Sequence, residues 1–189
     1  MKSSETSILV IAGHEGSGEA HWQQRMVAKL STAKIVEQED WFYGSLNKAV
    51  DALVAAVRAT DKPVVFVAHS AGCTLVAHAV PALQLAGLAG QVKGAFFVAA
   101  PSEEALAKLE PKVDAAMVTV PRAPLPFPSI LVASSNDPHA TLEQSADIAS
   151  AWGSQFLEAG EQGHINTASG HGPWPEGMMK FAGWLSRLA

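Results

Sequence analysis

Three residues far apart in the chain have the types and the order that acyl transfer requires. Ser70 stands at the centre of the pentapeptide AHSAG, Asp137 follows in the segment SSNDP, and His164 comes after both, in the segment GEQGHIN. A serine hydroxyl is a poor nucleophile until a base takes its proton, and histidine titrates in the range that suits this task. A carboxylate can hold the imidazole in the required tautomer and stabilise its charged form. We therefore take Ser70, Asp137 and His164 as candidate catalytic residues.

The sequence around Ser70 predicts a sharp turn from a strand into a helix. Residues 64–69 are mostly β-branched or aromatic, and a helix-compatible segment follows Ser70 without a spacer. Such a turn strains the serine backbone, exposes its hydroxyl and leaves the Ala71 amide at a helix N-terminus. Close crossing of strand and helix needs small residues at Ala68 and Gly72. The alternative is a serine that only caps a helix.

Asp137 and His164 each follow a predicted strand, which is where such a site needs them. Asp137 comes after residues 129–133 and precedes a proline, so a simple turn or cap is its alternative role. His164 comes after residues 155–157, but His171 lies in a nearby loop rich in glycine and proline. Spacing alone leaves the choice between the two histidines open.

The remaining parts of the predicted site are an oxyanion hole and a substrate pocket. Two backbone amides would stabilise the oxyanion: that of Ala71, and one from the loop after the first strand, supplied by His14 or Glu15. Segment 40–43 and a proline-rich stretch that ends near residue 127 are the expected pocket walls. The residues predicted to line the pocket are Glu15, Trp41, Phe127 and His139.

Alternating strands and helices position these residues. The pattern predicts a single α/β domain over residues 1–189, with a mostly parallel six-stranded sheet between two helical layers and right-handed crossovers. Expected strands are 8–12, 33–37, 64–69, 93–98, 129–133 and 155–157, and expected helices are 19–30, 46–57, 71–80, 141–152 and 176–188. Pro81 is expected to end the helix after Ser70. Residues 99–128 are expected to be irregular, which in a compact domain often marks a functional wall or lid.

The composition excludes several classes of protein. Of the 189 residues, 48% are hydrophobic and 16% charged, which is typical of a packed α/β protein and not of a disordered chain. A formal charge of −5, without a basic cluster, argues against nucleic-acid binding. The single Cys73 excludes an internal disulfide and a cysteine-based metal site, and we expect no cofactor or metal. With no signal peptide or membrane-length apolar run apparent, a cytoplasmic protein is expected.

The chain also resembles a known family. Its segment 163–177, GHINTASGHGPWPEG, is similar to the closing signature of small serine hydrolases related to retinoblastoma-binding protein 9 and its bacterial relatives. Shorter segments that support the resemblance are 21–22, 38–41, 69–73, 124–129 and 134–138. The resemblance implies an α/β-hydrolase fold without a large cap domain, with Ser70 as nucleophile, Asp137 as acid and His164 rather than His171 as base.

Two positions depart from the family pattern and bear on the pocket. Ala71 stands where relatives usually have a bulkier residue, and His139 stands where they have an aromatic one. The size and polarity of the pocket are therefore expected to differ from those of relatives. The family's natural substrates are poorly characterised, and ester and amide hydrolysis are what the three residues allow.

The leading interpretation is hydrolysis of a small carboxylic ester or amide through an acyl-enzyme, with any protein partner unknown. A non-catalytic binding module with a vestigial site is the alternative, because fold does not fix function. A nucleotide-binding oxidoreductase is disfavoured, since Gly13, Gly16 and Gly18 do not have the G-x-G-x-x-G spacing and Tyr43 lacks a lysine four residues on. Ser70 argues against dehalogenases and epoxide hydrolases, which use aspartate at this turn.

Overall fold

A wholly parallel six-stranded sheet forms the centre of the protein. A computed structural model describes residues 1–188, in which the strands lie in the order β2-β1-β3-β4-β5-β6. The strands are β1 (Ser7–Ile11), β2 (Ala33–Ile35), β3 (Val64–His69), β4 (Val92–Val98), β5 (Ser129–Ala133) and β6 (Gln155–Glu158). All the carboxyl ends therefore meet at one edge, where ligands of open parallel sheets bind.

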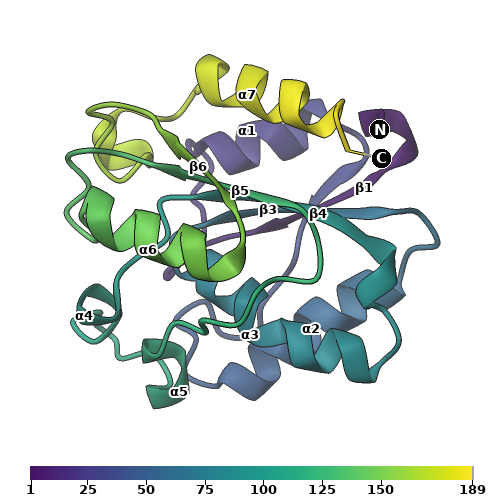
Figure 1. Cartoon of the computed structure of the whole chain (residues 1–189), viewed down its shortest axis with the longest axis horizontal. Helices are drawn as coiled ribbons and strands as arrows, with labels where there is room; N and C mark the ends of the chain where they lie inside the picture. Colours follow the sequence, from purple (N-terminus) through teal and green to yellow (C-terminus); the bar gives the residue numbers. More distant parts are fainter. Residues whose placement is uncertain (189) are drawn as a thin grey trace.

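Helices cover both faces of the sheet, as the alternating pattern predicted. The α-helices are α1 (Trp22–Lys29), α2 (Leu46–Arg58), α3 (Ala71–Leu85), α4 (Glu103–Leu106), α5 (Ala115–Val118), α6 (Leu142–Trp152) and α7 (Pro175–Leu185). Three 3-10 turns cover Ser3–Glu5, Ala89–Gln91 and Thr167–Ser169. Helices α1 and α7 lie on one face, while α2, α3 and α6 lie on the other (Figure 1). The expected arrangement, a parallel sheet between two helical layers, is confirmed.

Alternation along the central strands divides the core into two clusters. Phe66 of β3 points into the cluster built with α2, α3 and α6, whereas Val65 and Val67 point toward α1 and α7. Every residue of β3 is buried, because both of its faces are covered and β1 and β4 flank it. The strand that leads into Ser70 is thus held rigidly from all sides.

Two local predictions were wrong in detail. Helix α3 continues through Pro81 to Leu85, so proline removes one backbone donor without ending the helix. Packing of α3 on α2 and β3 stabilises the helix and offsets the missing hydrogen bond. Segment 99–128 is not wholly irregular, because it contains the short helices α4 and α5.

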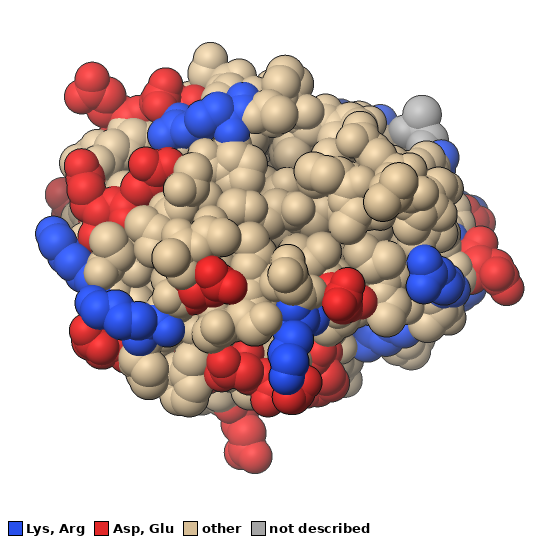
Figure 2. Space-filling model, turned by 90° about the horizontal axis from the view of Figure 1, so that it is seen from below, with Lys and Arg blue, Asp and Glu red and all other residues tan. Residues whose placement is uncertain are grey.

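The surface agrees with the small negative charge of the chain. On the face formed by α2, α3 and α5, charged side chains lie mainly around a broad uncharged area, and acidic side chains adjoin one another at parts of its edge (Figure 2). No helix within residues 1–188 is both long and apolar enough to cross a membrane.

Candidate active site

Ser70 occupies the turn between β3 and α3 in a strained conformation. Its φ of 53° and ψ of −131° are rare for a residue with a side chain. The neighbouring backbone leaves almost no space: a Cβ at Gly72 would lie 2.5 Å from the Ala12 carbonyl oxygen, and one at Gly13 would lie 2.8 Å from the Ser70 Cβ. The predicted need for a small residue two positions after the serine therefore comes from contact with the end of β1.

The three candidate catalytic side chains converge at the carboxyl edge of the sheet. The His164 Nε2 lies 2.9 Å from the Ser70 Oγ, and its Nδ1 lies 3.0 Å from each carboxylate oxygen of Asp137. The carboxylate is only 3% exposed, so its attraction to the imidazole is weakly screened by water. This is the geometry that a nucleophile, a base and an orienting acid require.

His171, the alternative base, belongs to a different hydrogen-bond network. Its Nε2 lies 2.7 Å from the Gln162 Oε1, and its Nδ1 lies 3.2 Å from the Ser169 Oγ. The ring also packs edge-on against Trp174. These contacts hold the loop that follows His164. The histidine that contacts Ser70 is His164, not His171.

The loops that carry Asp137 and His164 are bonded to each other. The Asn136 Oδ1 accepts hydrogen bonds from the Gly163 amide at 2.6 Å and from the Ser134 hydroxyl at 2.9 Å. The same hydroxyl accepts from the Gln162 amide at 2.9 Å. Two side chains after β5 thus fix the backbone just before His164.

The two candidate oxyanion donors of the loop after β1 differ in whether the amide already has a hydrogen-bond acceptor. The Glu15 amide donates to the Trp41 carbonyl at 2.9 Å, whereas the His14 amide has no acceptor among residues 1–188. The Ala71 amide at the start of α3 likewise has no acceptor within this part of the chain. The His14 side chain bonds the Pro111 carbonyl at 2.8 Å, which fixes the loop. The Ala71 and His14 amides are therefore available to an anion.

A polar hollow of about 270 Å³ surrounds the Ser70 hydroxyl. Its walls are the glycine-rich loop 13–18, two histidines described below, and residues 164–168. Among its described lining residues, Glu15 is the one acidic side chain, and no Lys or Arg takes part. Trp41 and His139, which were also predicted to line the pocket, are not among the residues that line this hollow. The Trp41 ring lies against Gly16 of the loop. The His139 ring lies beside the base, with its centroid 4.3 Å from that of His164.

Phe127 does not lie at this hollow, contrary to the pocket prediction. Its side chain is 6% exposed and packs edge-on against Phe66 in the core, with ring centroids 6.2 Å apart. The reason is its place in the chain: it immediately precedes the amino end of β5, which starts at Ser129. Ser70 lies at the carboxyl ends of the same parallel strands, on the opposite edge of the sheet.

Two further histidines, His69 and His21, lie next to the candidate base His164 and were not predicted as site residues. The Nε2 of His69 lies 2.9 Å from the His164 carbonyl oxygen, and its ring centroid is 4.9 Å from those of His21 and His164. Strand alternation offered a signal, because it places His69 on the same face as Val67, toward α1. His21 caps that helix by accepting a hydrogen bond from the Gln23 amide.

Burial keeps both supporting histidines neutral. Desolvation, with a smaller contribution from repulsion by His164 and His171, lowers the pKa of His21 to about 4. Complete burial also lowers the pKa of His69 well below its usual value. A neutral His69 ring can donate from Nε2 to the His164 carbonyl, as the distance between them requires.

This burial predicts that stability falls in mild acid. Between pH 6.5 and about pH 4 the unfolded chain protonates His21 while the folded chain does not, so the free energy of unfolding decreases as pH falls. The contribution of this residue is roughly 3 kcal/mol over the window. His21→Asn retains an oxygen that caps α1 and removes the titrating ring. In urea unfolding at pH 7.5 and pH 5, the variant should lose less stability than the wild type. An equal loss in both proteins would contradict the assignment.

Comparison with known proteins gives one family match and several structural neighbours. A sequence model of the family described as "Serine hydrolase" matches residues 8–183. A protein of Pectobacterium atrosepticum described as a YdeN-like hydrolase is 26% identical, with a TM-score of 0.80 over 95% of this chain and 90% of that one. The ydeN gene product of B. subtilis is 18% identical, with a TM-score of 0.70 over 97% of this chain and 100% of that one.

A more distant neighbour is the thioesterase RedJ from the prodiginine biosynthetic pathway of Streptomyces coelicolor. It is 16% identical, with a TM-score of 0.65 over 94% of this chain and 85% of that one, so the likeness concerns the fold. No curated protein matches the chain in sequence.

Proposed function

Since the chain belongs to the serine hydrolase family, as its sequence resemblance predicted, we propose that Ser70, His164 and Asp137 form its catalytic triad and that it hydrolyses small carboxylic esters or amides. The observation that carries the proposal is the pair of contacts made by one imidazole, 2.9 Å to the serine hydroxyl and 3.0 Å to the carboxylate. Each side chain comes from a different loop at the carboxyl edge of the sheet.

In the acylation step, the Ser70 Oγ attacks the substrate carbonyl carbon while the His164 Nε2 takes the hydroxyl proton. The carbonyl π electrons move to oxygen, and the resulting oxyanion is stabilised by the amides of Ala71 and His14. The bond to the leaving group then breaks, and the imidazolium gives its proton to the departing alcohol or amine. Asp137 keeps the Nδ1 proton hydrogen-bonded throughout and stabilises the transient positive charge.

In the deacylation step, water replaces the leaving group. His164 takes a proton from water as the oxygen attacks the acyl carbon, and the same two amides stabilise the second oxyanion. Breakdown of this intermediate returns the proton to the Ser70 Oγ and releases a carboxylic acid. The products balance as one acid and one alcohol or amine for each water consumed.

The hollow limits the kind of substrate that fits. Its volume of about 270 Å³ is small for a ligand pocket, and its walls are largely polar backbone and imidazole. Short acyl groups suit this space better than long alkyl chains. Glu15 adds negative charge at the rim, which disfavours substrates with a carboxylate near the scissile bond.

A fluorophosphonate probe tests the proposal directly, because it reacts only with an activated serine. We expect the folded wild-type protein to be labelled at Ser70, with no labelling of Ser70→Ala or of heat-denatured protein. Absence of labelling in folded protein would contradict the proposal. Labelling without turnover of any short-chain nitrophenyl ester or anilide would instead favour the non-catalytic binding module.

A further inference from the structure

A second cavity lies between α1 and α7, on the face of the sheet away from α2 and α3. Its volume is about 550 Å³, roughly twice that of the hollow at Ser70, and the two share no lining residue. This size is within the usual range for small-molecule sites. The cavity is therefore separate from the proposed catalytic centre.

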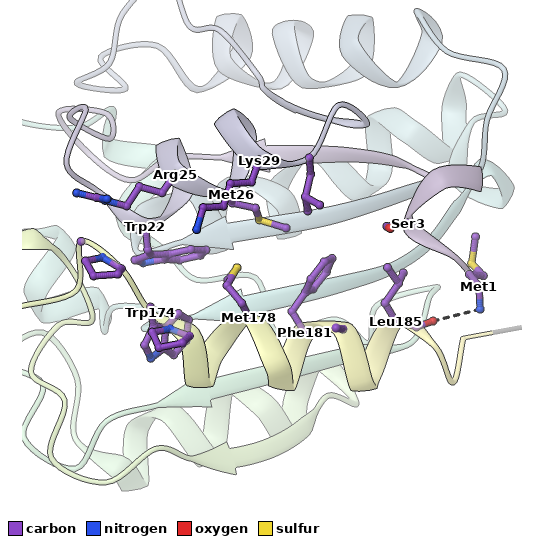
Figure 3. A pocket seen from close by; sticks show the side chains of 15 residues that line it. Met1, Ser3, Trp22, Arg25, Met26, Lys29, Trp174, Met178, Phe181 and Leu185 are labelled. Atoms are coloured by element: carbon purple, nitrogen blue, oxygen red, sulfur yellow. Dashed lines mark hydrogen bonds between the residues drawn. The ribbon is translucent and has the colours of Figure 1, made fainter.

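The floor and walls of this cavity are apolar. Trp22 and Met26 of α1 face Met178 and Phe181 of α7 across the opening, as Figure 3 shows. The α7 residues recur at helical spacing, so one face of that helix borders the cavity over its whole length. At one end Trp22 packs against Trp174, with ring centroids 5.2 Å apart. The two indole rings therefore form an apolar wall at this end of the cavity.

The charged residues at this cavity have a single sign. Arg25 and Lys29 of α1, one helical turn apart and both exposed, belong to its lining, whereas none of its described lining residues is acidic. Neither cation forms an ion pair with a carboxylate within residues 1–188. In a chain with a net charge of −5, an apolar cavity bordered only by cations differs in charge from the protein as a whole.

We propose that this cavity binds an amphiphilic anion, a medium-chain carboxylate whose alkyl chain lies between α1 and α7 and whose head group meets Arg25 and Lys29. Each methylene removed from water by the apolar walls adds to binding, which favours a chain over a compact acid. The head group gains charge-assisted hydrogen bonds from the two side chains. A volume of about 550 Å³ suits a single small molecule better than a protein segment, which would need a much larger contact area.

Isothermal titration with decanoate, below its micellar concentration, tests this proposal. The experiment uses the Ser70→Ala protein, with butyrate added as a competitor. Butyrate, a short-chain acid, would displace any decanoate that binds as a product in the catalytic hollow. We expect saturable 1:1 binding that butyrate does not displace. Decyltrimethylammonium, which has the same chain and the opposite charge, should bind at least tenfold more weakly.

Variants locate the binding. Arg25→Gln combined with Lys29→Gln should weaken decanoate binding at least tenfold, while Arg58→Gln on α2 should leave it unchanged. Met178→Asp should also weaken it at least tenfold, and Met179→Asp is the matched control, because Met179 is 69% exposed and does not line the cavity. The double glutamine variant changes only exposed side chains, so it remains informative if Met178→Asp fails to fold.

Three results would overturn the proposal: no saturable binding of decanoate, equal affinity for the cationic analogue, or unchanged affinity in the double glutamine variant. These results are independent of catalysis. Loss of decanoate binding in Arg25→Gln/Lys29→Gln with unchanged ester turnover would support a site separate from Ser70. Failure of fluorophosphonate labelling would count against the triad and leave the second site standing.

Discussion

Replacing Ser70 with alanine should lower kcat for a short-chain nitrophenyl ester by about 10⁶-fold, the loss seen when a triad serine is removed in another hydrolase. The alanine side chain cannot form the acyl bond, and the remaining groups supply only oxyanion stabilisation and binding. Initial rates over a range of ester concentrations, with the background hydrolysis subtracted, give the measurement. Thermal unfolding should show a folded variant, because the substitution removes one oxygen at a site open to the hollow.

His171→Gln is the control for this experiment. The glutamine removes an imidazole from the same region of the chain but leaves the contacts of His164 untouched, so the rate should stay within a few-fold of wild type. A Ser70→Ala protein that retained more than a small fraction of the wild-type rate would contradict the proposed mechanism. So would a loss in His171→Gln as large as that in Ser70→Ala.

Asp137→Asn should lower kcat by about 10⁴-fold, as the corresponding change does in another triad enzyme. The carboxylate accepts the Nδ1 proton of His164, with both oxygens 3.0 Å away. An amide in this place can donate to Nδ1, which favours the tautomer with the proton on Nε2 and leaves no base for the serine hydroxyl. The His139 amide, which now donates to the carboxylate, can still bond the asparagine oxygen.

Asp147→Asn provides the comparison for the aspartate variant. Asp147 lies on α6, and its carboxylate is 69% exposed and pairs with Arg122. Removal of this exposed charge should change neither the rate nor the stability appreciably. A kcat in Asp137→Asn that remained within tenfold of wild type would show that another group orients the imidazole.

Much of the fold follows from local patterns of residue type. The strand that leads into Ser70 is a run of apolar residues, and burial on both faces is what such a run predicts. Ser45 and Thr141 cap the helices that follow them, because each side chain accepts a hydrogen bond from a backbone amide of the first helical turn. Pro81 does not end α3 as predicted, because tertiary packing of the largely buried helix can outweigh the local cost of a proline.

The site was predictable only in part, because the order of residues along the chain does not show which of them meet at the same edge of the sheet. Ser70 and Asp137 could be chosen because each follows a strand, whereas His164 was preferred to His171 only through the family resemblance. Phe127 could not be placed correctly until its position before β5 put it at the opposite edge. His69 was passed over because a histidine in a buried strand is usually a core residue. Its contact with the His164 carbonyl depends on a loop 95 residues further along the chain.

The bonds from Ser134 and Asn136 to the backbone before His164 have a consequence for how the protein distinguishes its substrates. They join the loops of the proposed acid and base into one hydrogen-bonded unit. Binding energy is then not consumed in bringing these groups together, and a poor substrate meets the same reactive arrangement as a good one. Discrimination must come from which molecules can seat a carbonyl in the hollow, so bulky esters should be rejected at entry.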